Sequence, residues 1–142
     1  MAGPRLSRRR DRHCHGAASA RRPAPTGRRH TRAQRRPGSL FRFSALTFNG
    51  HRIHYDRDYA RDVEGYPGLV VHGPYAATLL IDLFLRETPG ARVTGFSFRA
   101  RQPLFDTQPF TINLQQGDGT CDAWTAGADR QPVMTASIGW ER

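Results

Sequence analysis

The spacing of hydrophobic and polar residues divides the chain into a helical part and a strand-rich part. Between Tyr75 and Leu85 the only polar residues are Thr78 and Asp82, and Gly73-Pro74 before them is typical of a helix N-terminus. This pattern predicts one helix, ended by the sequence at residues 88–90, that is apolar on nearly every face. Such a helix must be surrounded by protein.

After this helix the apolar residues recur at every second position, which indicates strands. Four strands are predicted, at residues 93–100, 110–115, 120–126 and 133–140. A buried helix followed by a four-strand antiparallel meander predicts an α+β fold in which the sheet wraps around the helix.

Short elements are predicted before the central helix. Ser44 is a suitable cap for a helical turn over residues 45–48, and Asn49-Gly50 is a strong turn dipeptide. The alternating charges of residues 56–63 indicate a short exposed helix.

The net charge of +10 belongs to the N-terminal segment alone. Residues 1–38 hold twelve arginines and one acid (+11), whereas residues 39–142 hold ten arginines and eleven acids (−1). A near-neutral body has no basic face for nucleic acid, so we expect no nucleic-acid partner. The chain contains no lysine, which we interpret as a bias of the coding DNA.

We expect residues 1–38 to be a disordered, Arg-rich arm in front of one folded domain at residues 39–142. Before Leu40 the only large apolar residues are Met1 and Leu6, too few to offset the entropy of ordering. Three interpretations stay open: an arm that binds nucleic acid or an acidic surface, an organelle transit peptide, and a mis-assigned start. We prefer the third because the composition changes abruptly at residues 37–39.

The two cysteines, Cys14 and Cys121, lie in different kinds of segment, so we expect no disulfide and a reducing, cytoplasmic location. No apolar run reaches the ~20 residues of a membrane span. We therefore expect no membrane partner.

Polar residues that can carry chemistry gather just before the central helix. Asn49 and His54 lie five residues apart, and His72-Gly73 opens the helix. This stretch resembles the motif of the MaoC-like acyl-thioester hydratases and dehydratases, in which Asp-x-Asn-Pro-aliphatic-His is followed, after roughly eighteen residues, by His-Gly. Ile53 matches the aliphatic position, and Asn49 replaces the aspartate. The closest resemblance is to the C-terminal half of mesaconyl-CoA hydratase-type proteins and to type 2 hydroxyacyl-thioester dehydratases.

The resemblance implies a single hotdog fold and a division of roles. His54 is expected to be the general base, Asn49 to orient water, and the Gly73 N–H to polarise the substrate carbonyl. Each residue also has a structural interpretation: His54 as a turn histidine, Asn49 as a turn former and Gly73 as a helix cap.

Further residues are expected around the substrate: Tyr55, His72 and Tyr75 at the pocket, and Arg99 and Arg101 at the phosphates of coenzyme A. The spacing of the histidines predicts no metal site. No cofactor is expected, because coenzyme A enters as the thioester substrate.

The resemblance thus implies hydration of an enoyl thioester, or dehydration of a 3-hydroxyacyl thioester, carried on coenzyme A or an acyl carrier protein. Two alternatives are a hotdog thioesterase and a non-catalytic acyl-binding or dimerisation subunit. We expect a homodimer or pairing with another hotdog domain, because the central helix needs cover on every side.

Overall fold

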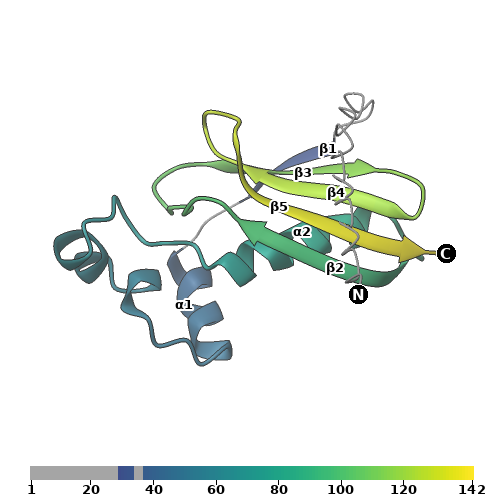
Figure 1. Cartoon of the computed structure of the whole chain (residues 1–142). Coiled ribbons are helices and arrows are strands. Elements are labelled where there is room, and N and C mark those ends of the chain that lie inside the picture. The colour runs from purple at the N-terminus through teal and green to yellow at the C-terminus, as the bar shows by residue number, and fades with distance from the viewer. Residues whose placement is uncertain (1–28, 34–36) are drawn as a thin grey trace, which may run out of the picture.

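The computed structural model of the chain describes residues 29–33 and 37–142. Figure 1 shows one curved sheet with a long helix along one face, and the shorter helices gathered beyond one end of the sheet. The elements are β1 (Arg29–Ala33), α1 (Pro37–Leu46), η1 (Arg52–His54), η2 (Tyr59–Val63), α2 (Gly73–Glu87), β2 (Arg92–Ala100), β3 (Phe110–Gln116), β4 (Thr120–Ala126) and β5 (Pro132–Glu141). The predicted α+β arrangement is confirmed.

The sheet has the strand order β1-β3-β4-β5-β2, with all neighbours antiparallel. Strands β3, β4 and β5 form the expected meander, but β2 lies at an edge of the sheet and pairs with β5 instead of β3. The prediction of a simple four-strand meander was therefore wrong for β2. The connection at residues 101–109 reaches on the order of 30 Å when extended, enough to cross the roughly 14 Å between β2 and β3. Alternating side chains identify a strand but not its partner.

Helix α2 packs on the sheet through one side. Ala76, Ala77, Leu80 and Phe84 are buried against the inward-facing residues of β3, β4 and β5. The remaining apolar residues of the helix are only partly covered, and Leu85 is 46% exposed. One sheet can cover only one side of a helix, so the described residues do not enclose α2 completely.

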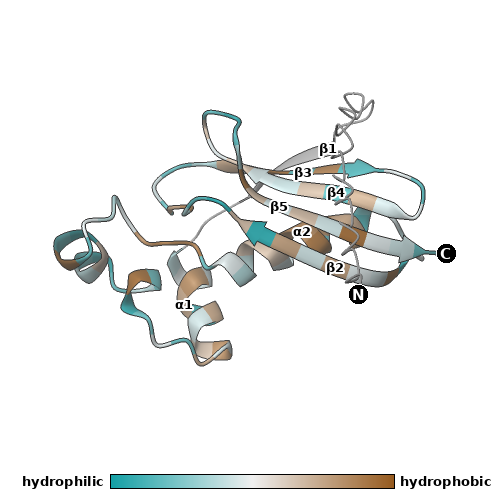
Figure 2. Cartoon of the chain, in the orientation of Figure 1, coloured by the Kyte–Doolittle hydropathy of each residue, from teal (hydrophilic) through white to brown (hydrophobic). Residues whose placement is uncertain are grey.

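The inner face of β2 is also poorly covered. Phe96 and Phe98 pair in register with Ile138 and Ala136 of β5 and so share their face of the sheet. Ile138 is fully buried, but Phe96 and Phe98 are 36% and 47% exposed. Figure 2 shows apolar residues continuing onto this edge strand, whereas the turns joining the strands are mostly hydrophilic.

The N-terminal segment differs from the predicted arm of residues 1–38. Residues 1–28 and 34–36 lie outside the described residues, but β1 pairs with β3 from Arg29↔Leu114 to Ala33↔Phe110. An edge strand is held by backbone hydrogen bonds, so it forms without the apolar side chains on which the prediction depended. Pro37 and Gly38, also assigned to the arm, begin α1.

Helix α1 is longer than the predicted turn. Ser44 lies inside it and is buried together with Leu40, one helical turn earlier, so the prediction that Ser44 caps a helix was wrong. The helix ends before Phe48, which has a positive φ of 53°. The short helix predicted at residues 56–63 is present, and its last turn is the π-helix η2. None of the described helices is long and apolar enough to cross a membrane.

Candidate active site

His54 is held by the segment that leads into α2. It lies on the 3-10 turn η1, is only 8% exposed, and places Nδ1 2.8 Å from the carbonyl oxygen of Val70. A carbonyl oxygen can only accept a hydrogen bond, so Nδ1 must carry the proton. The lone pair of the neutral ring is then on Nε2, which is the atom that can act as a base.

Burial favours this neutral form of His54. Loss of solvent is the largest influence and lowers the pKa of His54 below its usual value. The hydrogen bond to Val70 raises the pKa and only partly offsets burial, while His51 lowers it further. The imidazole is therefore unprotonated near neutral pH and able to accept a proton from water.

The ring of His72 packs against the ring of His54. The two rings are stacked, with centroids 3.7 Å apart and planes 15° apart. His72 is 2% exposed, its Nε2 lies 2.8 Å from Ser44 Oγ, and its Nδ1 has no hydrogen-bond partner among the described residues. Burial lowers the pKa of His72 to about 4, and the neighbouring His54 lowers it as well. A neutral His72 adds no positive charge beside the base.

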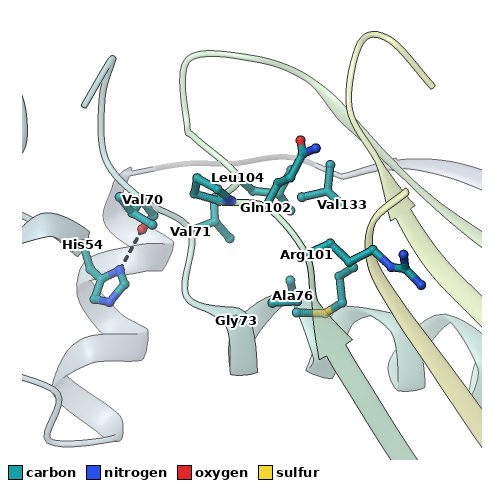
Figure 3. Close-up of a pocket in the computed structure, with 12 residues that line it drawn as sticks. His54, Val70, Val71, Gly73, Ala76, Arg101, Gln102, Leu104 and Val133 are labelled. Carbon is teal, nitrogen blue, oxygen red and sulfur yellow. Dashed lines mark hydrogen bonds between the residues drawn. The ribbon is translucent and has the colours of Figure 1, made fainter. Parts of the chain in front are cut away.

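His54 and Gly73 open onto one cavity of about 340 Å³ (Figure 3). Most of the wall is aliphatic. The cavity is lined by His54, Val70, Val71, Gly73, Ala76, Ala100, Arg101, Gln102, Pro103, Leu104, Val133 and Met134. A base and the start of a helix thus meet in one largely apolar space.

Gly73 is the first residue of α2 and lies at the positive end of the helix dipole. The first N–H groups of a helix have no partner within the helix, so this end favours an oxyanion. A Cβ added to Gly73 would meet only Met134 Cε, at 3.8 Å. The protein therefore has room for a side chain here, and its absence leaves the backbone open to the cavity.

Asn49 does not line this cavity. Its Oδ1 accepts a hydrogen bond of 3.0 Å from the backbone N–H of His51, and so shapes the turn that leads into η1. The predicted role of Asn49 in orienting water stays a prediction. The structure shows how it helps to place the chain that carries His54.

The other predicted substrate residues are dispersed. Tyr55 donates its hydroxyl to the Gly50 carbonyl at 2.8 Å, Tyr75 packs on Phe43, and neither lines the cavity. His72 lies behind His54. Arg101 lines the cavity and extends away from His54 (Figure 3), whereas Arg99 borders a separate hollow on the sheet. The two arginines therefore do not share one site.

Of the cavity segment at residues 101–104, only Arg101 was predicted to lie near the substrate; the part played by Gln102, Pro103 and Leu104 was not. The Val70 carbonyl was not predicted either, because a backbone acceptor leaves no trace in residue type. The pair Val70-Val71 was a signal for a buried extended segment, but not for its role at His54.

No group of three or more His, Cys, Asp or Glu side chains within residues 37–142 is arranged to hold a metal ion. Cys121 is buried in β4, and burial raises the pKa of its thiol to about 11. At neutral pH this thiol is protonated and a poor nucleophile. Cys14 lies outside the described residues.

Comparison with known proteins gives consistent results. The family described as "Hydroxyacyl-thioester dehydratase type 2" matches residues 6–106. Over 102 residues the chain is 50% identical to a mesaconyl-C(4)-CoA hydratase of Chloroflexus aurantiacus, covering 72% of this chain and 36% of the relative. Over 96 residues it is 36% identical to a mitochondrial hydroxyacyl-thioester dehydratase type 2 of Schizosaccharomyces pombe, covering 66% of this chain and 32% of the relative. The chain thus spans about a third of the length of these relatives.

Among solved structures, an (R)-hydratase from A. caviae involved in PHA biosynthesis superposes with a TM-score of 0.72 at 17% identity. The superposition covers 86% of this chain and 98% of the hydratase. This likeness confirms the expected hotdog fold.

Proposed function

The chain belongs to the hydroxyacyl-thioester dehydratase type 2 family, and we propose that its cavity hydrates an enoyl thioester and dehydrates the corresponding 3-hydroxyacyl thioester. The observation that carries this proposal is the placement of His54 and Gly73 on one apolar cavity, with Nδ1 of His54 engaged by Val70. Hydration needs a base for water and a donor for the developing enolate oxygen, and these residues supply the two in one space.

In the proposed reaction, Nε2 of His54 takes a proton from water as the oxygen bonds to C3 of the enoyl group. The C2–C3 π electrons move toward the thioester carbonyl, whose oxygen accepts a hydrogen bond from the Gly73 N–H. The imidazolium then returns its proton to C2, so water is added across the double bond. His54 performs both proton transfers, because Asn49 cannot accept a proton at neutral pH.

For the substrate, we propose a short-chain thioester of coenzyme A. The support is the 50% identity to a mesaconyl-C(4)-CoA hydratase, together with the small cavity volume. Arg101 is the arginine that lines the cavity, and its side chain extends away from His54 (Figure 3). We therefore assign it, rather than Arg99, to the phosphates of the carrier, which lie at the far end of the thioester from the reacting carbons.

We also propose that a second hotdog domain, from another copy or another chain, covers β2 and α2. Strand β2 is an edge of the described sheet, and Phe96 and Phe98 on its inner face are incompletely covered. Leu85 of α2 is exposed as well. A second domain would bury apolar surface that the described residues leave exposed.

The test measures hydration of crotonyl-CoA and of mesaconyl-C(4)-CoA. Hydration is monitored through the ultraviolet absorbance of the conjugated thioester, which falls as the double bond is consumed. Replacing the base in His54→Ala should lower kcat by roughly 10²–10⁴-fold. His51→Ala is the comparison variant, because it removes an exposed neighbouring ring but leaves the base in place; its one expected effect on the base is loss of the influence by which His51 lowers the pKa of His54. Turnover of His54→Ala at the parent rate would refute the assignment and favour the non-catalytic subunit.

Two further outcomes separate the remaining alternatives. Release of free coenzyme A thiol without hydration would identify a thioesterase. Asn49→Asp tests the departure from the common motif: retained or higher activity would mean that a carboxylate works at this position. A large loss would mean that the site depends on an uncharged amide beside the turn.

A further inference from the structure

The orientation of His54 depends on the position of Val70. The Val70 carbonyl accepts the His54 Nδ1–H at 2.8 Å, and the Val70 N–H donates to the Ile53 carbonyl at 2.9 Å. Both polar groups of one backbone residue are thus used to hold the turn that carries the base. Any movement of Val70 would carry the imidazole with it.

Val70 is in turn held by a segment that lies far away in the sequence. Val70 and Phe105 form an antiparallel bridge. On either side of it, the Val71 N–H donates to the Leu104 carbonyl at 2.8 Å and the Asp106 N–H donates to the Leu69 carbonyl at 2.9 Å. This small ladder joins the support of His54 to the segment that forms the opposite cavity wall, since Leu104 also lines the cavity.

A buried carboxylate closes the end of this ladder. The side chain of Asp106 is 3% exposed, and its Oδ1 accepts from the Leu69 N–H at 2.9 Å and from Arg57 Nη1 at 3.2 Å. Its Oδ2 accepts from Arg57 Nη2. Gly68 leaves the necessary room, because a Cβ there would lie 2.7 Å from Asp106 Oδ1.

Arg57 follows His54 by only three residues along the chain, so its ion pair with Asp106 leads back to the segment that carries the base. The contacts therefore form a closed circuit from His54 through Val70, the ladder and Asp106 to Arg57. We propose that Asp106 and Arg57 are positioning residues that fix the imidazole of His54 relative to the opposite wall of the cavity. This proposal rests on the proposed function only for its kinetic test.

The chemistry of the pair favours positioning over general stabilisation. A buried ion pair often contributes little net stability compared with apolar residues, but it fixes geometry through directional hydrogen bonds. The planar guanidinium meets the carboxylate through two nitrogens, and the remaining capacity of Oδ1 is used by the backbone of Leu69. The segments that contain Arg57, Leu69 and Asp106 are thereby held in one arrangement.

The test compares Asp106→Asn, Arg57→Gln and the more conservative Arg57→Lys in the full chain. The matched control is Arg92→Gln. Arg92 also forms an ion pair across 49 residues of sequence, with Glu141, but its side chain is 73% exposed and lies on β2. One readout is kcat and KM for crotonyl-CoA. The other is titration of the His54 imidazole by NMR, which needs no turnover.

We expect Asp106→Asn and Arg57→Gln to lower kcat by about 10- to 100-fold, because a small misplacement of a catalytic group is enough for such a loss. KM should change far less. The pKa of His54 should rise toward its ordinary value of 6.5, since burial is the largest cause of its depression and a loosened segment admits water. Arg57→Lys should retain part of the activity, and Arg92→Gln should behave as the parent.

The proposal is overturned if a folded Asp106→Asn variant titrates at His54 as the parent does and keeps kcat within about twofold of Arg92→Gln. If Asp106→Asn does not fold, Arg57→Gln decides by the same criteria, because the Arg57 side chain is 39% exposed and easier to replace. If the parent hydrates no thioester, the proposed function fails, while the NMR titration still confirms or overturns the positioning role.

Discussion

Acidification should destabilise the protein through His72, and His72→Gln should remove this effect. In the folded chain burial lowers the pKa of His72 to about 4, against 6.5 for the exposed side chain. Glutamine cannot titrate, but its amide can still hydrogen-bond to Ser44. The comparison of parent and variant therefore isolates the protonation of one buried ring.

Whether acid stabilises or destabilises the fold depends on which state, folded or unfolded, binds the proton to His72 more tightly. Above pH 6.5 the imidazole is neutral in both states, so the contribution of His72 is fully present. As the pH falls from 6.5 to 4, the unfolded state takes up the proton and the folded state does not, so folding stability is lost. A difference of about 2.5 pH units, at about 1.36 kcal/mol per unit, corresponds to a loss of about 3 kcal/mol.

The assay is urea denaturation of the parent and His72→Gln between pH 7.5 and pH 4. At pH 7.5 the variant should be the less stable, because it loses the stacked ring beside His54. The difference in unfolding free energy should then change by about 3 kcal/mol in favour of the variant by pH 4. Ser44→Ala is the control, because it removes the hydrogen bond but keeps the buried imidazole. It should be about 1 kcal/mol less stable than the parent at every pH.

A difference between parent and His72→Gln that stays constant within about 0.5 kcal/mol over this range would refute the reasoning. It would mean that the His72 ring gains solvent or a partner on protonation. If Ser44→Ala, rather than His72→Gln, abolished the acid sensitivity, the hydrogen bond and not burial would be the controlling influence.

Two further predictions concern substrate binding and pairing. Gly73→Ala should leave the melting temperature nearly unchanged, because the added Cβ would fit 3.8 Å from Met134 Cε. The same variant should lower kcat for crotonyl-CoA, and unchanged kinetics would exclude a close approach of the thioester to the Gly73 backbone. Phe98→Glu should weaken self-association in sedimentation equilibrium, because it places a charge on the exposed inner face of β2. A parent chain that sediments as a stable monomer at micromolar concentration would exclude pairing with another copy of this chain.

The local elements were predictable because their signals are local. The apolar run ending at Leu85 identified α2, and the alternation of Phe96 and Phe98 identified β2. The pairing of β2 with β5 was not predictable in the same way, since it depends on the path of residues 101–109 across the sheet. Strand β1 was missed because backbone pairing does not require apolar side chains.

The candidate site was also predictable only in part. His54 and Gly73 belong to a recognisable motif, and the structure brings both to one cavity. The sequence did not indicate that His54 Nδ1 would be bonded to a backbone carbonyl. Nor did it pair Arg57 with Asp106, because 49 residues separate them and arginine and aspartate are common surface residues.

The position of β2 at the far edge of the sheet has a consequence for synthesis on the ribosome. The chain emerges from its N-terminus, so β2 is available well before β5, the strand with which it pairs over Arg92↔Glu141 to Ala100↔Met134. Until residues 132–141 leave the exit tunnel, β2 lacks β5, its partner among the described strands, so Phe96 and Phe98 are unpaired. A nascent chain that stalls before this point would present an unpaired apolar strand to other proteins. Shortening the chain by its last strand should therefore expose a binding site for chaperones rather than produce a smaller folded domain.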